Sequence, residues 1–369
     1  MKAINSGNIY EIFDDSVKTF DQLPSQTYVV RFDKHKGFFL EKYVDIEISE
    51  NKIYGVHLEK VEKVLNSFAA FNRSLGVILS GDKGIGKSLF AKLLAVEAVR
   101  RDIPLIVVDT FIPGIASYIE SIDQEVMVLF DEFDKTFGEV QAKDGEASPQ
   151  ANLLGLFDGV SGGKKLFVIT CNELRKLNDY LINRPGRFHY HFRFEYPSPK
   201  EIREYLEDKL PTEHHNEIDD VIAFSKKINL NYDCLRAIAF EISLGETFKD
   251  AIRDLNIINV DTERYNVTLH YTNGMTVCAK SVYLDLFNDA TETVYLYDKR
   301  GDYIAEVDFN PTNCEFNTHK MANIIMPDVL RVEYTSDDDQ KAVVEQLKAT
   351  PIEYLSITRQ HGKSLHYVV

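Results

Sequence analysis

The residues best suited to chemistry form a loop of the phosphate-binding pattern G-x-x-x-x-G-K-[ST], which spans Gly81–Ser88 and reads GDKGIGKS. Glycines let the backbone wrap closely round an anion and point N–H groups at it, together with the positive end of a following helix. Lys87 is expected to neutralise the β- and γ-phosphates, and the Ser88 hydroxyl to be a ligand of Mg²⁺. The loop therefore predicts that the chain binds a nucleotide together with Mg²⁺.

The sequence on both sides of the loop has the context that this motif requires. Residues 76–80 form an apolar run that predicts a buried strand, and apolar residues from Leu89 onward recur at helical spacing. The alternative is a glycine-rich turn that matches the pattern by chance, and the two flanks argue against it. The nucleotide-binding residues expected here are Gly81, Asp82, Lys83, Gly84, Ile85, Gly86, Lys87, Ser88 and Leu89.

Two carboxylates directly follow another apolar run that predicts a strand. The apolar run Val126–Phe130 predicts a buried strand, and it ends directly in Asp131 and Glu132. At the carboxyl end of such a strand, Asp131 can hold Mg²⁺ through water, and Glu132 can polarise the water that attacks the γ-phosphate. An Asp-Glu pair alone means little, but downstream of a phosphate-binding loop it predicts hydrolysis of the bound nucleotide.

A polar side chain also follows the apolar strand predicted for residues 165–170, where Cys171 leads to Asn172. If the predicted strands lie parallel in one sheet, Asn172 is placed beside the phosphate-binding loop, and its amide could orient the attacking water. The alternative is that Asn172 is simply a turn-favouring residue at the end of a strand.

Two arginines, Arg184 and Arg187, flank the Pro185-Gly186 turn. Such a turn is expected to project both guanidinium groups from the surface. Taken alone they would be surface charges. With the preceding motifs they predict donors that stabilise charge on the γ-phosphate held by a neighbouring subunit.

Composition narrows the class of protein. The chain has 369 residues, enough for two or three domains, and its net charge of −16 opposes broad attraction to nucleic acid backbones. It has no run of about 18 apolar residues, and acidic residues occur where a signal peptide would need an apolar stretch, so we expect a cytoplasmic protein. Neither the four cysteines nor the histidine pairs have the spacing typical of a metal site.

The motifs from Tyr54 to about Ile242 resemble the AAA+ ATPases, and the block Asn172–Phe188 resembles the second region of homology of the AAA proteins proper. The run Leu153–Val160 is similar to that of the mitochondrial inner-membrane AAA translocases, but this chain lacks their transmembrane segment. The resemblance implies that Lys87 and Ser88 are the Walker A pair. It also implies that Asp131 and Glu132 are the Walker B pair and that Asn172 is the first sensor. Arg184 and Arg187 would be the trans-acting arginine fingers.

Three further sites are less clearly marked by their residues. Tyr54 and Gly55 lie where many such ATPases pack the adenine ring, although simple packing explains them almost as well. Arg236, in a segment that looks like the second sensor of clamp-loader-type members, could reach the γ-phosphate or lie on a helix surface. Phe111 is either a contact of the central pore or an ordinary packing residue, because Pro113 interrupts the usual pore-loop pattern.

The expected fold is α/β, with a P-loop AAA+ parallel sheet of five strands, a helical lid, an N-terminal β element and a C-terminal α+β domain. A capping box at Ser198 starts the lid, and Asn273-Gly274 predicts a hairpin after it. Further strands are expected near residues 329–334, 354–358 and 365–369, with one helix over about 338–348. The predicted domains are residues 1–50, 51–197, 198–255 and 256–369.

The resemblance implies a Mg²⁺-dependent ATP hydrolase that works as a homo-oligomeric ring or spiral, with a hexamer expected, and remodels a macromolecular target, for which a protein is favoured. A nucleic-acid loader or motor and a nucleotide-switched scaffold are the alternatives. As a whole, the chain also looks like the uncharacterised AAA-family ATPases encoded by tailed bacteriophages, which implies the cytoplasm of a bacterial or infected bacterial cell. No membrane partner is expected.

Overall fold

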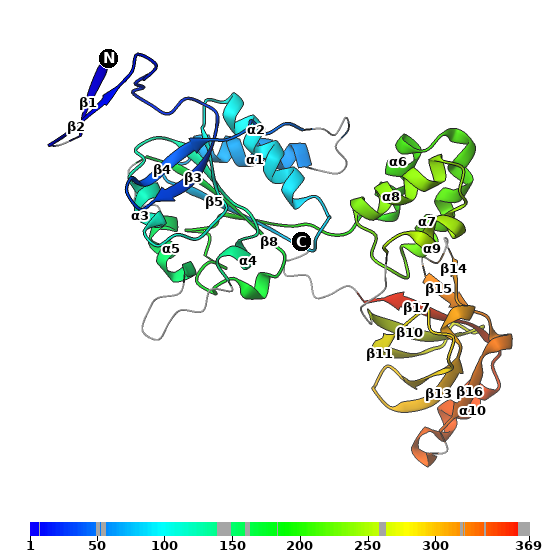
Figure 1. Ribbon diagram of the computed structural model, residues 1–369. Helices are drawn as coiled ribbons and strands as arrows, with labels where there is room; N and C mark the ends of the chain where they lie inside the picture. The colour runs from blue at the N-terminus through cyan, green and yellow to red at the C-terminus, as the bar shows by residue number, and fades with distance from the viewer. Residues whose placement is uncertain are drawn as a thin grey trace. The chain divides into compact units, whose positions relative to one another are not determined.

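A computed structural model describes residues 1–6, 8–48, 52, 57–138, 149–158, 163–182, 184–257, 263–317, 320, 322–335 and 337–360. The chain divides into two compact units, Met1–Pro197 and Ser198–Val369 (Figure 1). Tyr54, Gly55 and the strand expected at residues 365–369 lie outside the described residues. None of the described helices has both the length and the apolar character that crossing a membrane requires.

The first unit is built on a sheet of seven strands in the order β4-β3-β6-β7-β8-β5-β9. All neighbouring strands are parallel except β4, which pairs antiparallel with β3. The expected α/β fold with five parallel strands is confirmed in β6, β7, β8, β5 and β9. The strands are β3 (Thr27–Asp33), β4 (Gly37–Lys42), β5 (Leu75–Ser80), β6 (Leu105–Val108), β7 (Val126–Phe130), β8 (Lys165–Cys171) and β9 (Tyr190–Arg193).

The central strands are buried along their whole length, which explains why they appear in the sequence as continuous apolar runs. Successive side chains of a strand enter different cores. Ile78 and Val128 belong to one apolar cluster, whereas Val77 and Met127 belong to another. Because neighbouring side chains on a strand point to opposite faces, both faces of the sheet are covered.

Helices provide these two covers (Figure 1). The helices α1 and α2 contribute to one apolar cluster, and α3, α4 and α5 contribute to the other. The result is a three-layer α/β unit. The helices are α1 (His57–Ala70), α2 (Lys87–Arg100), α3 (Ile115–Glu120), α4 (Phe133–Thr136), α5 (Pro149–Phe157) and the 3₁₀ turn η1 (Leu174–Lys176).

Part of the predicted N-terminal β element joins the main sheet instead of standing apart from it. The predicted hairpin is present as β3 and β4, but Tyr28 and Val29 of β3 pair with β6, so the hairpin widens the main sheet. A second hairpin, β1 (Lys2–Ser6) with β2 (Ile9–Phe13), forms its own sheet of two strands.

The second unit begins with a group of helices. Ser198 and Glu201 form the predicted capping box, because the Ser198 Oγ accepts from the Glu201 N–H and the Glu201 carboxylate accepts from the Ser198 N–H. Asn231 caps a later helix by accepting from the Cys234 N–H at 2.8 Å. The helices are α6 (Pro199–Lys209), η2 (Thr212–Glu217), α7 (Ile218–Phe224), α8 (Tyr232–Ser243) and α9 (Phe248–Asp254).

An antiparallel sheet of eight strands completes this unit, in the order β14-β15-β17-β10-β11-β12-β13-β16. The predicted Asn273-Gly274 turn joins β10 to β11, with Gly274 at a φ of 82°. The elements are β10 (Glu263–Tyr271), β11 (Thr276–Leu284), β12 (Glu292–Tyr297), β13 (Tyr303–Phe309), η3 (Pro311–Asn313), β14 (Glu315–Asn317), β15 (Ala322–Ile325), η4 (Pro327–Val329), β16 (Arg331–Tyr334), η5 (Asp338–Gln340), α10 (Lys341–Lys348) and β17 (Ile352–Arg359).

Candidate nucleotide site

The loop Gly81–Ser88 connects the carboxyl end of β5 to the first turn of α2, so backbone N–H groups and the positive end of a 14-residue helix meet there. Glycine is needed at Gly81 for two reasons. Its φ is 142°, and a Cβ would lie 2.5 Å from the Phe194 carbonyl oxygen. Glycine at this position therefore lets the start of the loop pack directly against the backbone that follows β9.

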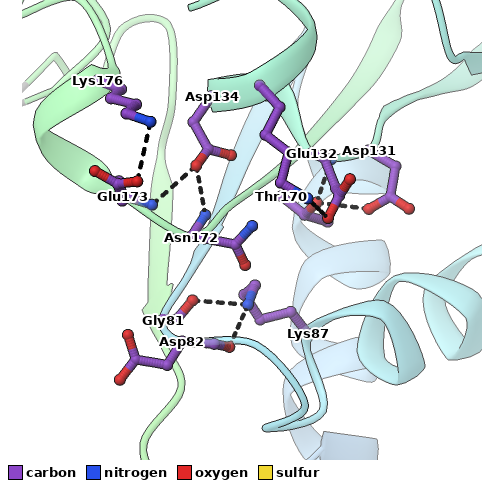
Figure 2. Close-up of polar contacts among 11 residues, drawn as sticks. Gly81, Asp82, Lys87, Asp131, Glu132, Asp134, Thr170, Asn172, Glu173 and Lys176 are labelled. Atoms are coloured by element: carbon purple, nitrogen blue, oxygen red, sulfur yellow. Dashed lines mark hydrogen bonds and ion pairs between the residues drawn. The ribbon is translucent and has the colours of Figure 1, made fainter. Parts of the chain in front are cut away.

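Lys87 lies inside this loop with only 7% of its surface exposed. Its Nζ donates to the carbonyl oxygens of Gly81 at 2.7 Å and Asp82 at 2.5 Å (Figure 2). Burial lowers the pKa of Lys87, and nearby acidic groups partly oppose this effect. An ammonium group held by neutral carbonyls in a confined site is well placed to exchange them for phosphate oxygens.

Asp131 and Glu132 follow β7 at the same edge of the sheet. Thr170 of β8 connects them, because its Oγ1 donates to Asp131 Oδ1 at 2.6 Å and accepts from the Glu132 N–H at 2.8 Å (Figure 2). Glu132 has φ 48° and ψ 47°, a left-handed conformation that is rare outside glycine and concentrated at functional sites. We call this edge, formed by the Gly81–Ser88 loop with Asp131, Glu132 and Asn172, the nucleotide edge.

The carboxylate of Glu132 forms an ion pair with Lys135, one turn along α4. This hydrogen bond lowers the pKa of Glu132, and the charge of Lys83 acts in the same direction. Glu132 is therefore ionised at neutral pH, as a group that orients and polarises a water molecule must be. Half of its side chain remains exposed, which leaves it accessible to that water.

Asn172 follows β8 and is drawn between Asp134 and Lys87 in Figure 2. Its backbone N–H donates to Asp134 Oδ2 at 3.1 Å. Its side-chain nitrogen Nδ2 is buried and makes no hydrogen bond of ordinary geometry among the described residues, although the Asn172 amide helps to lower the pKa of Glu132. A buried donor without a partner is costly, so this amide fits a site that a polar ligand completes.

The donor set suits Mg²⁺ held by a nucleotide. Mg²⁺ prefers oxygen ligands and is usually bound through one or two protein groups together with substrate phosphates. Ser88 is exposed at the start of α2, and Asp131 is partly exposed at the end of β7. Among the described residues, no group of three or more His, Cys, Asp or Glu side chains could hold a metal ion by itself. Ser88 and Asp131 would hold the ion only when phosphate oxygens complete its shell.

The structure separates the two arginines expected to act together. The Arg187 side chain is 13% exposed, and its Nε and Nη2 donate to the two carboxylate oxygens of Asp158. Its Nη1 donates to the Tyr180 carbonyl oxygen at 2.9 Å. Arg184 is exposed, and its guanidinium lies over the Tyr180 ring at 5.2 Å. Arg187 is thus engaged within its own chain, whereas Arg184 faces solvent.

The position of these arginines relative to the sheet matters more than their exposure. We call Arg184–Phe188 the arginine turn. The backbone of this turn approaches Gly76 so closely that a Cβ on Gly76 would lie 2.3 Å from the Arg187 carbonyl oxygen, and Arg73 Nη1 donates to the Gly186 carbonyl. Gly76 is at the amino end of β5 and the phosphate-binding loop follows its carboxyl end. The turn and the loop are therefore separated by roughly 17 Å, at about 3.3 Å per residue.

The three less clearly marked predictions, Tyr54 with Gly55, Arg236 and Phe111, have different outcomes in the structure. Tyr54 and Gly55 lie outside the described residues. Arg236 belongs to the second unit, on α8, where it is 66% exposed and pairs with Asp233 at 3.8 Å. Phe111 is partly buried and packs edge-to-face on Phe137, with ring centroids 5.8 Å apart, which is the packing alternative for this residue.

Sequence reasoning missed two residues of the nucleotide edge, Thr170 and Asp134. Thr170 appeared only as the polar end of an apolar strand. Asp134 lies two residues beyond the predicted pair Asp131 and Glu132, and its burial, with 1% of its surface exposed, was not predicted. No local signal pointed to this burial, because the partner of Asp134 is the backbone of Asn172, 38 residues further along the chain.

Comparison with known proteins adds two findings. Residues 77–196 match the family model described as ATPase family associated with various cellular activities (AAA). The chain is also similar to a protein of Corynebacterium jeikeium (strain K411) named AAA ATPase forming ring-shaped complexes, with 25% identity over 223 residues. The alignment covers 54% of this chain and 40% of the length of that relative.

Proposed function

Because the chain belongs to the AAA+ superfamily of ATPases, we propose that it is a Mg²⁺-dependent ATP hydrolase that works in an assembly of identical subunits. The phosphate-binding loop with Lys87 would hold the triphosphate. Ser88 and Asp131 would hold the metal, and Glu132 would polarise the attacking water while Asn172 orients it. The products are ADP and phosphate.

One observation carries the proposal of an assembly. The arginine turn lies at the opposite end of β5 from the phosphate-binding loop of its own chain, and an arginine side chain is far too short to span that strand. Arg184 can therefore serve only a nucleotide held by another copy. A contact between different surfaces of identical subunits repeats head to tail, and it closes into a ring or continues as a spiral.

Further support comes from the relative from Corynebacterium jeikeium, whose printed name describes ring-shaped complexes. We propose a ring or spiral, with a hexamer as the expected form. The proposed target is a protein rather than a nucleic acid, because the chain carries a net charge of −16. Stimulation of hydrolysis by single-stranded DNA at moderate salt would instead favour a nucleic-acid motor.

A mixing experiment tests the shared catalytic centre. Glu132→Gln removes the carboxylate that polarises water, and Arg184→Ala removes the charge given to the neighbour. Each variant alone should be nearly inactive. When the two are mixed in equal amounts, about one interface in four joins an intact nucleotide edge to an intact Arg184. The mixture should therefore recover about a quarter of the parental rate of ATP hydrolysis.

The control is a mixture of Glu132→Gln with Lys87→Ala, which impairs only one side of every interface. No interface in that mixture contains an intact nucleotide edge, so no activity should return. Recovery in this control would contradict a centre made by two subunits. So would the absence of recovery in the first mixture when co-purification through an affinity tag on one variant shows that mixed assemblies form.

A further inference from the structure

Asp134 is a buried carboxylate that none of the roles described above uses. It lies in the first turn of α4, two residues after Glu132, and only 1% of its surface is exposed. Removing a carboxylate from water is expensive unless hydrogen bonds replace the lost hydration. The partners of Asp134 therefore indicate what the chain gains from burying it.

Those partners belong to a different strand. Oδ2 of Asp134 accepts the backbone N–H of Asn172 at 3.1 Å and that of Glu173 at 3.0 Å (Figure 2). Both residues follow β8, whereas Asp134 follows β7. One carboxylate oxygen thus fixes the backbone at the tip of the neighbouring strand to the helix that starts with the Glu132 turn.

Two buried polar atoms near the contact between Asp134 and Asn172 form no hydrogen bond of ordinary geometry among the described residues, and one is an acceptor while the other is a donor. The acceptor is Asp134 Oδ1 and the donor is Asn172 Nδ2. Asp134 Oδ2 is already occupied by two backbone donors, so the link holds the backbone of Asn172 and leaves its side-chain amide available. The direction in which that amide points depends on the backbone that Asp134 holds.

Thr170 forms a second link between the same elements, from β8 to Asp131 and to the Glu132 N–H. The residues before and after Cys171 are therefore both tied to the segment that carries Glu132. A displacement of Glu132 must move Asn172 with it, because two short side chains connect the segments on either side of the strand end.

We propose that Asp134 is a positioning residue for ATP hydrolysis, which sets the distance between the Asn172 amide and the Glu132 carboxylate by holding the backbone of Asn172. The inference rests on the proposed function, since it assigns Asp134 to the same site. A merely structural carboxylate would affect folding and not turnover. A positioning residue lowers kcat and leaves nucleotide affinity unchanged, because the hydrogen bonds of Asp134 go to the backbone of Asn172 and Glu173 and not to Lys87.

The experiment compares Asp134→Ala, Asn172→Ala and the double variant in the full-length chain. We expect Asp134→Ala to lower kcat by about 10- to 100-fold, as a misplaced catalytic group does, with the Kd for a fluorescent ATP analogue unchanged. The double variant should be no slower than the slower single variant, because both changes remove the same interaction. Multiplying effects, a normal kcat for Asp134→Ala, or a loss of nucleotide affinity would each overturn the proposal.

A second variant keeps the test decisive if Asp134→Ala fails to fold. Asp134→Asn has the same shape and keeps one neutral acceptor oxygen, so it should fold and lose kcat only by about three- to tenfold. Asp109→Asn is the matched control, because Asp109 follows β6 at the same end of the sheet but pairs with Arg31. An Asp134→Asn variant with the parental kcat would show that the charge of Asp134 does not position Asn172.

Hydrogen exchange separates this inference from the proposed function. The amides of Asn172 and Glu173 donate to Asp134, so overlapping peptides that cover residues 171–174 should exchange faster in both Asp134 variants than in the parent. If the parent does not hydrolyse ATP, the proposed function fails, and the exchange result still decides whether Asp134 holds the strand end. Unchanged exchange in both variants would remove the link on which the inference depends.

Discussion

At the nucleotide edge, hydrogen bonds connect the segments that follow β7 and β8, whereas in the arginine turn one guanidinium is held by its own chain and the other faces solvent. Thr170 and Asp134 connect the segments at the nucleotide edge. Asp158 and the Tyr180 carbonyl hold Arg187, and Arg184 stays exposed.

The difference fits a division of catalytic roles within the proposed assembly. Groups that must keep fixed distances from one another, such as Glu132 and Asn172, are connected by short bonds inside one chain. A group that must meet a nucleotide on another copy has to be presented outward, and only its base is fixed. Arg187 fixes that base, so the two arginines are not equivalent even though they lie three residues apart.

The largest expected effect tests the outward arginine. Arg184→Ala should lower kcat for ATP hydrolysis by about 10³-fold, as removal of a charge that stabilises the transferring phosphoryl group does, and should leave the Kd for nucleotide unchanged. Arg175→Ala, which removes an exposed arginine from η1, is the matched control and should keep the parental rate. Loss of rate in both variants would mean that the effect is not specific to Arg184, and the comparison would lose its basis.

A smaller effect is expected for the arginine that holds the turn. Arg187→Ala should lower kcat by about tenfold, because Arg184 then lies less often in its productive position. Asp158→Ala should have a similar effect, since it removes the partner of Arg187 and leaves both arginines in place. The double variant should be no worse than either single variant.

The Asp158 variant decides between the two roles of Arg187. A second finger would make Arg187→Ala as damaging as Arg184→Ala, and Asp158→Ala would then hydrolyse ATP at the parental rate because the arginine itself remains. That pattern, measured by steady-state hydrolysis at matched nucleotide saturation, would show that the Arg187–Asp158 contact opens in the working assembly.

Much of the nucleotide edge could be predicted from the sequence because its signals are local. The loop around Lys87 has a fixed spacing, and Asp131, Glu132 and Asn172 each follow a continuous apolar run that had to be a buried strand. Parallel strands bring their carboxyl ends to one edge, so the grouping followed from the strand assignments alone.

The features that could not be predicted depend on contacts between distant residues. Arg184 and Arg187 are chemically identical in the sequence, and the contacts of Arg187 with Asp158, 29 residues before it, and with the Tyr180 carbonyl distinguish them. Burial of Asp134 required knowing which strand lies beside β7. In the same way, the pairing of the β3–β4 hairpin with β6 depends on a register that no local pattern specifies.

The smallest expected effect concerns how the arginine turn responds to pH. Arg187 lowers the pKa of Asp158 by hydrogen bonding. A carboxyl group with a lowered pKa in the folded chain stabilises the fold above its unfolded pKa, about 3.9, and this contribution disappears as pH falls through the folded value. Asp158→Asn should therefore lower the free energy of unfolding by at most about 1 kcal/mol near neutral pH, since Asp158 is 44% exposed.

That difference between the parent and Asp158→Asn should stay constant between about pH 5 and 8 and vanish below the folded pKa, because the parental carboxyl is then neutral too. Urea unfolding at several pH values measures it, and Asp179→Asn, which changes an exposed carboxylate between η1 and the arginine turn, is the matched control. A difference that grows as the pH falls would mean that Asp158 is not held ionised by Arg187. The base of the arginine turn would then be held by the Tyr180 carbonyl alone, and Arg187 could turn toward a neighbouring copy as Arg184 does.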